Sequence, residues 1–171
     1  MTTARILVQW VAGLACALSG PVAGAREYTG NDLSYESFID SNKRIKCLYG
    51  YAAEKTGDHE AARLIFEDCI RRWQDVYSMI WLADLYENEF GVPRDVNRAT
   101  ALMQQGAESD GTGGYAALAR YHYGMALLEG HGTARNPEEG LRWLRRAAEE
   151  GVPDAARHLK LIAAQASSPP P

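Results

Sequence analysis

The chain has 171 residues, of which 46% are hydrophobic and 23% are charged, a composition typical of one globular domain. Its 18 Lys and Arg residues against 22 Asp and Glu residues give a net charge of −4 at pH 7. Nucleic acids and anionic lipids are held by clustered basic side chains, so this balance argues against either one as a general partner.

The first 25 residues predict an export signal. Arg5 precedes a mostly apolar run from Ile6 to Leu18, and Ala23-Gly24-Ala25 has the small-x-small pattern that signal peptidases recognise. We therefore expect cleavage after Ala25 and a mature protein that begins at Arg26, in the periplasm or outside the cell.

Two alternatives to a cleaved signal remain open. An uncleaved anchor would have to span the bilayer in spite of Gln9 and Pro21, which interrupt a run already near the minimum length. A lipid anchor on Cys16 lacks the large aliphatic residue that usually stands three positions earlier. We expect no membrane span in the mature chain.

The mature chain opens with a polar segment, residues 26–34, which predicts a flexible lead-in. A helix is expected from there to Thr56, because its apolar residues recur at steps of mostly three and four: Phe38, Ile39, Ile45, Leu48, Tyr49 and Ala52. Gly57 ends this helix, and Asp58 caps a second one. The apolar stripe of the second helix ends at Trp73.

The two cysteines of the mature chain lie on this helical hairpin. Cys47 comes ten residues before Gly57 and Cys69 comes twelve after it. At a rise of 1.5 Å per residue both lie about 15–18 Å from the turn, at the same height on facing helices. We predict a Cys47–Cys69 disulfide, which agrees with an oxidising compartment. The alternatives are two free buried thiols or a zinc site, which would lack two of its four ligands.

A second hairpin follows. The pattern predicts a helix from about Val76 to Phe90-Gly91, where Pro93 prevents its continuation, and a partner helix capped by Asp95. Ser109 to Gly114 is rich in glycine and polar residues, and predicts the most flexible internal linker.

The third hairpin begins after this linker. Its second helix has a cap at Asn136, a proline at the first helical position and an acid at Glu139, which together form a strong start signal. A last helix is expected from Gly151 to about Ala164, and residues 165–171 predict a disordered Pro-rich tail.

These hairpins repeat each other in sequence. Gly91-Val92-Pro93-Arg94-Asp95 recurs 41 positions later as Gly132-Thr133-Ala134-Arg135-Asn136. Such a period is typical of stacked-repeat proteins. At a spacing of 37 the first hairpin also fits, with Tyr49 on Tyr86, Asp58 on Asp95 and Ala62 on Ala99.

The repeated residues resemble the Sel1-like repeat, a relative of the tetratricopeptide repeat. One copy is carried by Ala83, Tyr86, Gly91 to Asp95, Ala99 and Gly106-Ala107, and a better one by Gly124, Gly132, Gly140 to Trp143 and Arg146 to Gly151. Glu89 and Gly106 depart from the usual pattern. The resemblance implies an all-α fold over residues 35–164, an α/α superhelical solenoid of about three hairpins plus a C-terminal helix.

The resemblance further implies a protein-interaction scaffold that binds through a concave face lined by the first helix of each hairpin. The expected binding residues form two matching stripes: Trp81, Asp84 and Asn88, then His122, Met125 and Glu129. An aromatic residue and a methionine flanked by polar groups are typical of an interface core. The alternative is that Trp81 is simply a core residue between repeats.

The sequence offers no catalytic or cofactor site. Its four histidines have no second ligand at helical spacing, and neither a nucleophile elbow nor a phosphate loop occurs. We therefore expect a non-catalytic, exported adaptor without metal or cofactor, whose partner is another protein. The alternatives are an immunity or inhibitor protein that neutralises a toxic enzyme in the periplasm, and a cell-envelope hydrolase.

Overall fold

The structure, a computed structural model, describes residues 35–167, and within them the only regular elements are helices. The predicted export signal, the lead-in at 26–34 and the last four residues of the predicted tail lie outside the described residues. The helices are α1 (Glu36–Ile39), α2 (Lys46–Lys55), α3 (His59–Trp73), α4 (Val76–Asn88), α5 (Val96–Ala107), α6 (Gly114–Glu129), α7 (Pro137–Glu149) and α8 (Pro153–Ser167).

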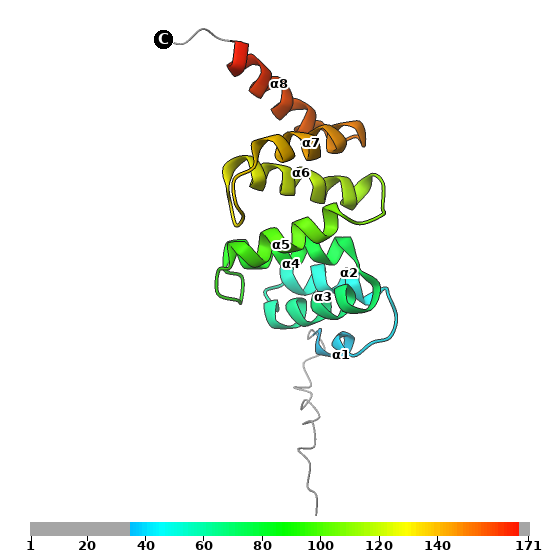
Figure 1. Cartoon of the computed structure of the whole chain (residues 1–171). Coiled ribbons are helices and arrows are strands. Elements are labelled where there is room, and N and C mark those ends of the chain that lie inside the picture. The colour runs from blue at the N-terminus through cyan, green and yellow to red at the C-terminus, as the bar shows by residue number, and fades with distance from the viewer. Residues whose placement is uncertain (1–34, 168–171) are drawn as a thin grey trace, which may run out of the picture.

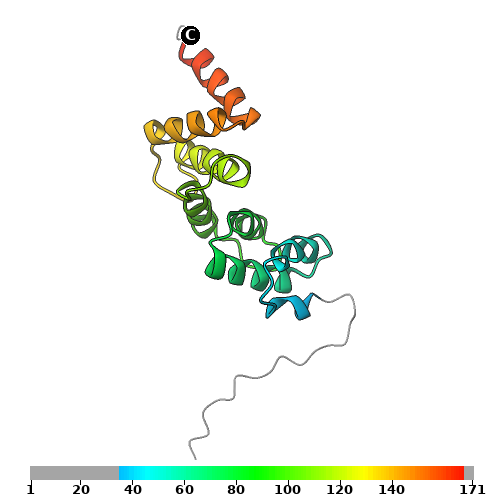
Figure 2. The ribbon, with the colours of Figure 1, turned by 90° about the vertical axis from the view of Figure 1, so that its right-hand side faces the viewer.

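Three hairpins, α2–α3, α4–α5 and α6–α7, stack on one another and α8 follows at the end of the stack (Figure 1). Viewed from the side, the successive helices follow a curved path (Figure 2). This architecture confirms the predicted all-α solenoid. The last helix continues to Ser167, three residues beyond the predicted end of the repeat domain.

The second helix of each hairpin begins at a polar cap. Asp58, Asp95 and Asn136 each accept a hydrogen bond from the backbone N–H three residues on, at 3.2, 2.9 and 3.2 Å. The Asn136 amide donates in return to Glu139, at 2.9 Å. These side chains satisfy amides that the first helical turn leaves free, so the sequence determines where the second helices start.

The single helix predicted up to Thr56 is wrong, because the chain breaks between α1 and α2. In a continuous helix the Ile39 carbonyl would accept from the backbone four residues on; here it accepts from the Lys46 ammonium, at 2.8 Å. Lys46 is fully buried and also forms an ion pair with Asp68 of α3. Although burial raises the pKa of Asp68, hydrogen bonds from Lys46 and Arg72 outweigh it and lower that pKa.

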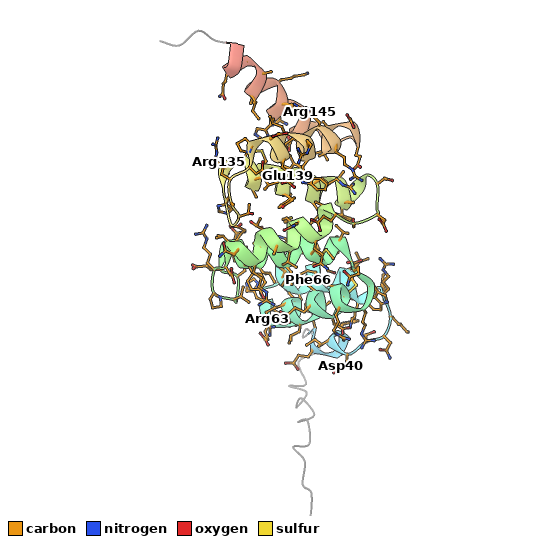
Figure 3. The ribbon with its side chains drawn as sticks, in the orientation of Figure 1. Asp40, Arg63, Phe66, Arg135, Glu139 and Arg145 are labelled. Carbon is orange, nitrogen blue, oxygen red and sulfur yellow. A yellow bond between two sulfur atoms is a disulfide. The ribbon has the colours of Figure 1, made fainter. Side chains whose placement is uncertain are left out.

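The face that α2 buries also differs from the prediction. Cys47, Gly50 and Ala53 are buried, whereas Ile45 and Leu48 are each 55% exposed. A Cβ on Gly50 would lie 2.5 Å from the ring of Phe66, which sits inside the first hairpin (Figure 3). A glycine is therefore needed for α2 to approach α3.

The predicted alignment of Tyr49 with Tyr86 is wrong because the turn of the first hairpin is shorter than that of the second. The ends of α2 and α4, Lys55 and Asn88, are 33 positions apart, while α3 and α5 begin 37 apart. The turn between α2 and α3 is thus four residues shorter, and at the spacing of 33 it is the buried Ala53 that corresponds to Tyr86.

A disulfide joins Cys47 of α2 to Cys69 of α3, with the two Cα atoms 6.0 Å apart. This is the pair expected from the hairpin geometry. Both residues are buried within the first hairpin, so the bond clamps a repeat that, within residues 35–167, has a neighbouring repeat on one side only.

Small residues hold the two helices of a hairpin close together. A Cβ on Gly140 of α7 would lie 2.7 Å from the Gly124 carbonyl of α6. The equivalent positions 41 residues earlier are Ala83 and Ala99, both buried. The repeat signature is therefore a packing signature: its small residues mark where helix axes approach.

The predicted flexible linker, Ser109 to Gly114, is instead tied down by Arg120 of α6. The Arg120 guanidinium donates to the carbonyls of Ala107, Ser109 and Gly111 at 3.0, 2.8 and 2.7 Å. It also forms an ion pair with Glu150 at the end of α7, and its side chain is fully buried. One side chain thus joins the linker to the third hairpin.

Candidate functional site

A large hollow lies between the second and third hairpins. It has a volume of about 500 Å³ and lies between α4 and α6, with α5 contributing Ala99, Thr100 and Met103. We call it the α4–α6 groove. Because α4 and α6 are the first helices of their hairpins, the groove lies on the face that the sequence predicts to bind a partner.

Aromatic side chains form one end of this face. Tyr51 and Trp81 have ring centroids 4.6 Å apart, Trp81 and Tyr77 6.2 Å, and Tyr77 and Tyr115 4.9 Å. Together Tyr51, Tyr77, Trp81 and Tyr115 are the aromatic shelf. Burial, with a contribution from Tyr115, raises the pKa of Tyr77 to about 12, so its hydroxyl stays neutral at physiological pH.

The shelf continues into a second, smaller hollow of about 370 Å³, bordered by Tyr77 and Tyr115. Ile45, directly before α2, and Leu48 of α2 also border it. Both are large apolar side chains that are exposed. Apolar surface therefore extends over the first helices of all three hairpins. Continuous exposed apolar surface of this kind marks interaction sites.

The other end of the groove is polar and acidic. Asp84, Glu87 and Glu129 contribute carboxylates, and His122 and His131 lie among them. Burial, followed by the charge of Glu54, raises the pKa of Asp84. Part of His122 reaches solvent, yet the surrounding walls desolvate it and lower its pKa, so the ring is neutral at pH 7.

One contact bridges the two repeats at this acidic end. His131, in the turn between α6 and α7, lies 2.9 Å from a Glu87 carboxylate oxygen on α4. The Thr100 hydroxyl of α5 donates to the His131 carbonyl at 3.0 Å. The groove is thus a preformed feature with its two sides fixed to each other.

The structure brings five of the six predicted binding residues together in the groove: Trp81, Asp84, His122, Met125 and Glu129. Asn88 is not among the groove residues. It is exposed near the end of α4, where its amide donates to the Asp84 carboxylate at 2.8 Å. Asn88 therefore orients a groove residue and does not line the groove itself.

Sequence reasoning missed the aromatic partners of Trp81. Tyr115 lies two helical turns before the second predicted stripe, seven residues ahead of His122, and Tyr77 lies one turn before the first, four residues ahead of Trp81. That spacing places Tyr77 and Trp81 on the same face of α4. Extending the first stripe by one turn and the second by two turns, toward the start of each helix, would have found them.

The described residues hold no group of three or more His, Cys, Asp or Glu side chains able to bind a metal ion. Between Tyr35 and Ser167, every helix is too short or too polar to cross a lipid bilayer. Two carboxylates of the third hairpin are paired with arginines: Glu138 lies 3.5 Å from Arg142, and Glu150 lies 3.2 Å from Arg146.

Comparison with known proteins identifies the repeats. The Sel1 repeat family matches residues 76–111 and 117–152, which are the two stretches related by 41 positions. Sel1 repeats generally mediate protein–protein interactions. The sequence matches no curated protein.

Two solved structures share the fold. A Sel1 repeat protein from Oxalobacter formigenes is 21% identical with a TM-score of 0.62, covering 71% of this chain and 47% of its own. A protective antigen present in uropathogenic Escherichia coli strains, with an SLR fold, is 24% identical with a TM-score of 0.60, covering 71% of this chain and 26% of its own. The chain thus spans about half the length of the first and about a quarter of the second.

Proposed function

This chain is a Sel1-like repeat protein, and on that premise we propose that it is a non-catalytic scaffold that binds another protein through the α4–α6 groove. The observation that carries the proposal is the groove itself, a preformed hollow of about 500 Å³ that joins an exposed aromatic shelf. Aromatic side chains and methionine are enriched in protein interfaces, and tryptophan and tyrosine are among the few residues that dominate the binding energy. Trp81, Met125 and their polar neighbours Asp84, His122 and Glu129 are the proposed contact residues.

Replacing Trp81 and Met125 with aspartate should abolish capture of the partner. Each change places a charge where an apolar partner side chain would be desolvated, and losses at such central positions often reach 2 kcal/mol or more, about thirtyfold in affinity. The measurement is recovery of partner from a native envelope extract by the immobilised full chain, for wild type and for the double variant.

Leu161→Asp serves as the matched control, because Leu161 is a 54% exposed apolar residue on α8, away from the groove. It should capture the partner as well as wild type does. Circular dichroism of the double variant must remain helical. A double variant that stays helical and still captures the partner would contradict the proposal.

We also propose that the protein works outside the cytoplasm, in the periplasm or beyond the cell. The Cys47–Cys69 disulfide supports this compartment, because such bonds persist where the environment is oxidising. The sequence of residues 1–25 supports it independently.

Mass spectrometry of the protein purified from its native cells tests the compartment. We expect a mature chain that begins at Arg26. A diacylglyceryl group on Cys16 would replace this proposal with a membrane-anchored lipoprotein, and an intact Met1 to Pro171 chain from the cytoplasmic fraction would refute export.

A further inference from the structure

The lining of the α4–α6 groove includes the carboxylates of Asp84 and Glu129. Neither forms an ion pair with a described residue. Glu87 differs, since its carboxylate is engaged by His131. The nearest lysine, Lys55, is taken up by Glu54, with Nζ and Oε2 2.9 Å apart.

The negative charge of Asp84 is unfavourable in the groove. Burial and the negative charge of Glu54, with a further contribution from Glu87, raise the pKa of Asp84, although the charge of Lys55 and the hydrogen bond from Asn88 oppose the shift. A raised carboxyl pKa means that the groove destabilises the ionised form. A cation that enters the groove would therefore remove an existing repulsion as well as gain attraction to Asp84.

The neighbouring aromatic shelf is also suited to a cation. The Lys55 ammonium already lies 4.8 Å from the Trp81 ring and 5.3 Å from the Tyr51 ring. Such placements of a cation over an aromatic face are attractive. Trp81 and Tyr115 of the shelf line the same hollow as Met125 and the carboxylates. One segment of a partner can therefore contact both the aromatic and the acidic side chains.

From this juxtaposition we infer that the partner inserts a basic segment, in which an arginine or lysine side chain reaches Asp84 and Glu129 while an adjacent aromatic or long aliphatic side chain packs against Trp81 and Tyr115. The inference rests on the proposed function and deepens it by giving the chemistry of the partner. Complementary charge of this kind sets specificity and association rate.

The test is a selection of random dodecapeptides displayed on phage against the immobilised full chain with its disulfide intact. Selected peptides are then synthesised, and their Kd is measured by calorimetry at low and high NaCl concentration. We expect enrichment of Arg or Lys beside Trp, Tyr, Phe or Leu, and binding that weakens as salt rises.

Three variants interpret the result. Asp84→Asn with Glu129→Gln should weaken the selected peptides at least about tenfold, because it removes both carboxylates that receive the cation. Glu138→Gln makes the same kind of change at an exposed site on α7 and should leave Kd unchanged. Trp81→Asp should weaken binding through the shelf.

Failure of the inference is distinguishable from failure of the proposed function. One outcome is that the selected peptides have no enriched basic residues, bind the Asp84→Asn, Glu129→Gln variant normally and do not bind the Trp81→Asp variant. This outcome would overturn the charge inference and leave the groove as a binding site. Peptides indifferent to all three variants, or no enrichment at all, would overturn both.

Discussion

Replacing Arg120 with methionine should lower the free energy of unfolding by about 3–5 kcal/mol, the cost of breaking a buried ion pair by removing one partner. The guanidinium is fully buried and donates to three carbonyls, that of Ala107 at the end of α5 and those of Ser109 and Gly111 in the linker. Methionine has a similar length and can donate to none of them, and it leaves Glu150 without its buried partner. Chemical denaturation followed by circular dichroism measures the difference.

Arg142→Met provides the matched control. Arg142 is exposed on α7 and lies 3.5 Å from Glu138 in an i,i+4 pair, a contact worth about 0.5 kcal/mol or less. An Arg120→Met variant as stable as this control would mean that the linker does not depend on Arg120.

The Arg120–Glu150 pair also predicts a direction of pH dependence. Burial raises the pKa of Glu150, but hydrogen bonds from Arg120 and Arg146 outweigh this and lower it below its ordinary value. Its ionised form therefore stabilises the fold at pH values above the unfolded pKa, and this stability is lost as the pH falls through the lowered pKa. The Arg120→Met variant should consequently lose less stability on acidification than wild type.

Removing the disulfide should have the second largest effect, about 3 kcal/mol for a loop of 22 residues in the chain-entropy model. The expected loss is concentrated in the first hairpin, because within residues 35–167 this repeat packs against a neighbour on one side only. A Cys47→Ala, Cys69→Ala double variant, measured by denaturation and by amide hydrogen exchange, should show faster exchange in α2 and α3 before the other helices.

Reductant supplies the control for this prediction. It should destabilise wild type by the same amount and leave the double variant unchanged. Equal stability of oxidised and reduced wild type would show that the clamp contributes nothing to the folded state.

The sequence predicted the features of the fold that local chemistry determines. The caps at Asp58, Asp95 and Asn136 mark helix starts because a short polar side chain there satisfies free amides, whatever lies elsewhere in the fold. The pairing of Cys47 with Cys69 follows from helix rise alone. The 41-residue period likewise reports small residues such as Gly140 that every hairpin needs.

The phase of α2 could not be obtained in this way. Its helical periodicity selects Ile45 and Leu48, but these residues form exposed surface beside the aromatic shelf. The buried face instead carries Lys46 and Glu54. Lys46 pairs with Asp68 of α3, which is distant in sequence, and Glu54 pairs with its neighbour Lys55. A binding surface and a core are both apolar, so periodicity alone does not distinguish them.

The same limit applies to the linker and to the groove. Ser109 to Gly114 has a flexible composition, and its order depends on Arg120 and Glu150, which follow later in the chain. At the groove, helix periodicity placed Asn88 on the stripe of Trp81 and Asp84, but the lining of the hollow on α4 extends to Glu87 and does not include Asn88. Its boundary is set by the His131 turn of the next repeat, which only the stacking of hairpins brings near α4.

Site-specific photo-cross-linking tests the central claim most directly, namely that the stacked hairpins leave a groove that a partner protein occupies. In one variant, benzoylphenylalanine replaces Tyr115, which is half exposed on the aromatic shelf. In a second variant it replaces Arg145, which is exposed on α7 (Figure 3). We predict that irradiation in the native envelope extract links the partner to the probe at position 115 and not to the one at 145. Cross-linking at position 145 with none at 115 would contradict the account.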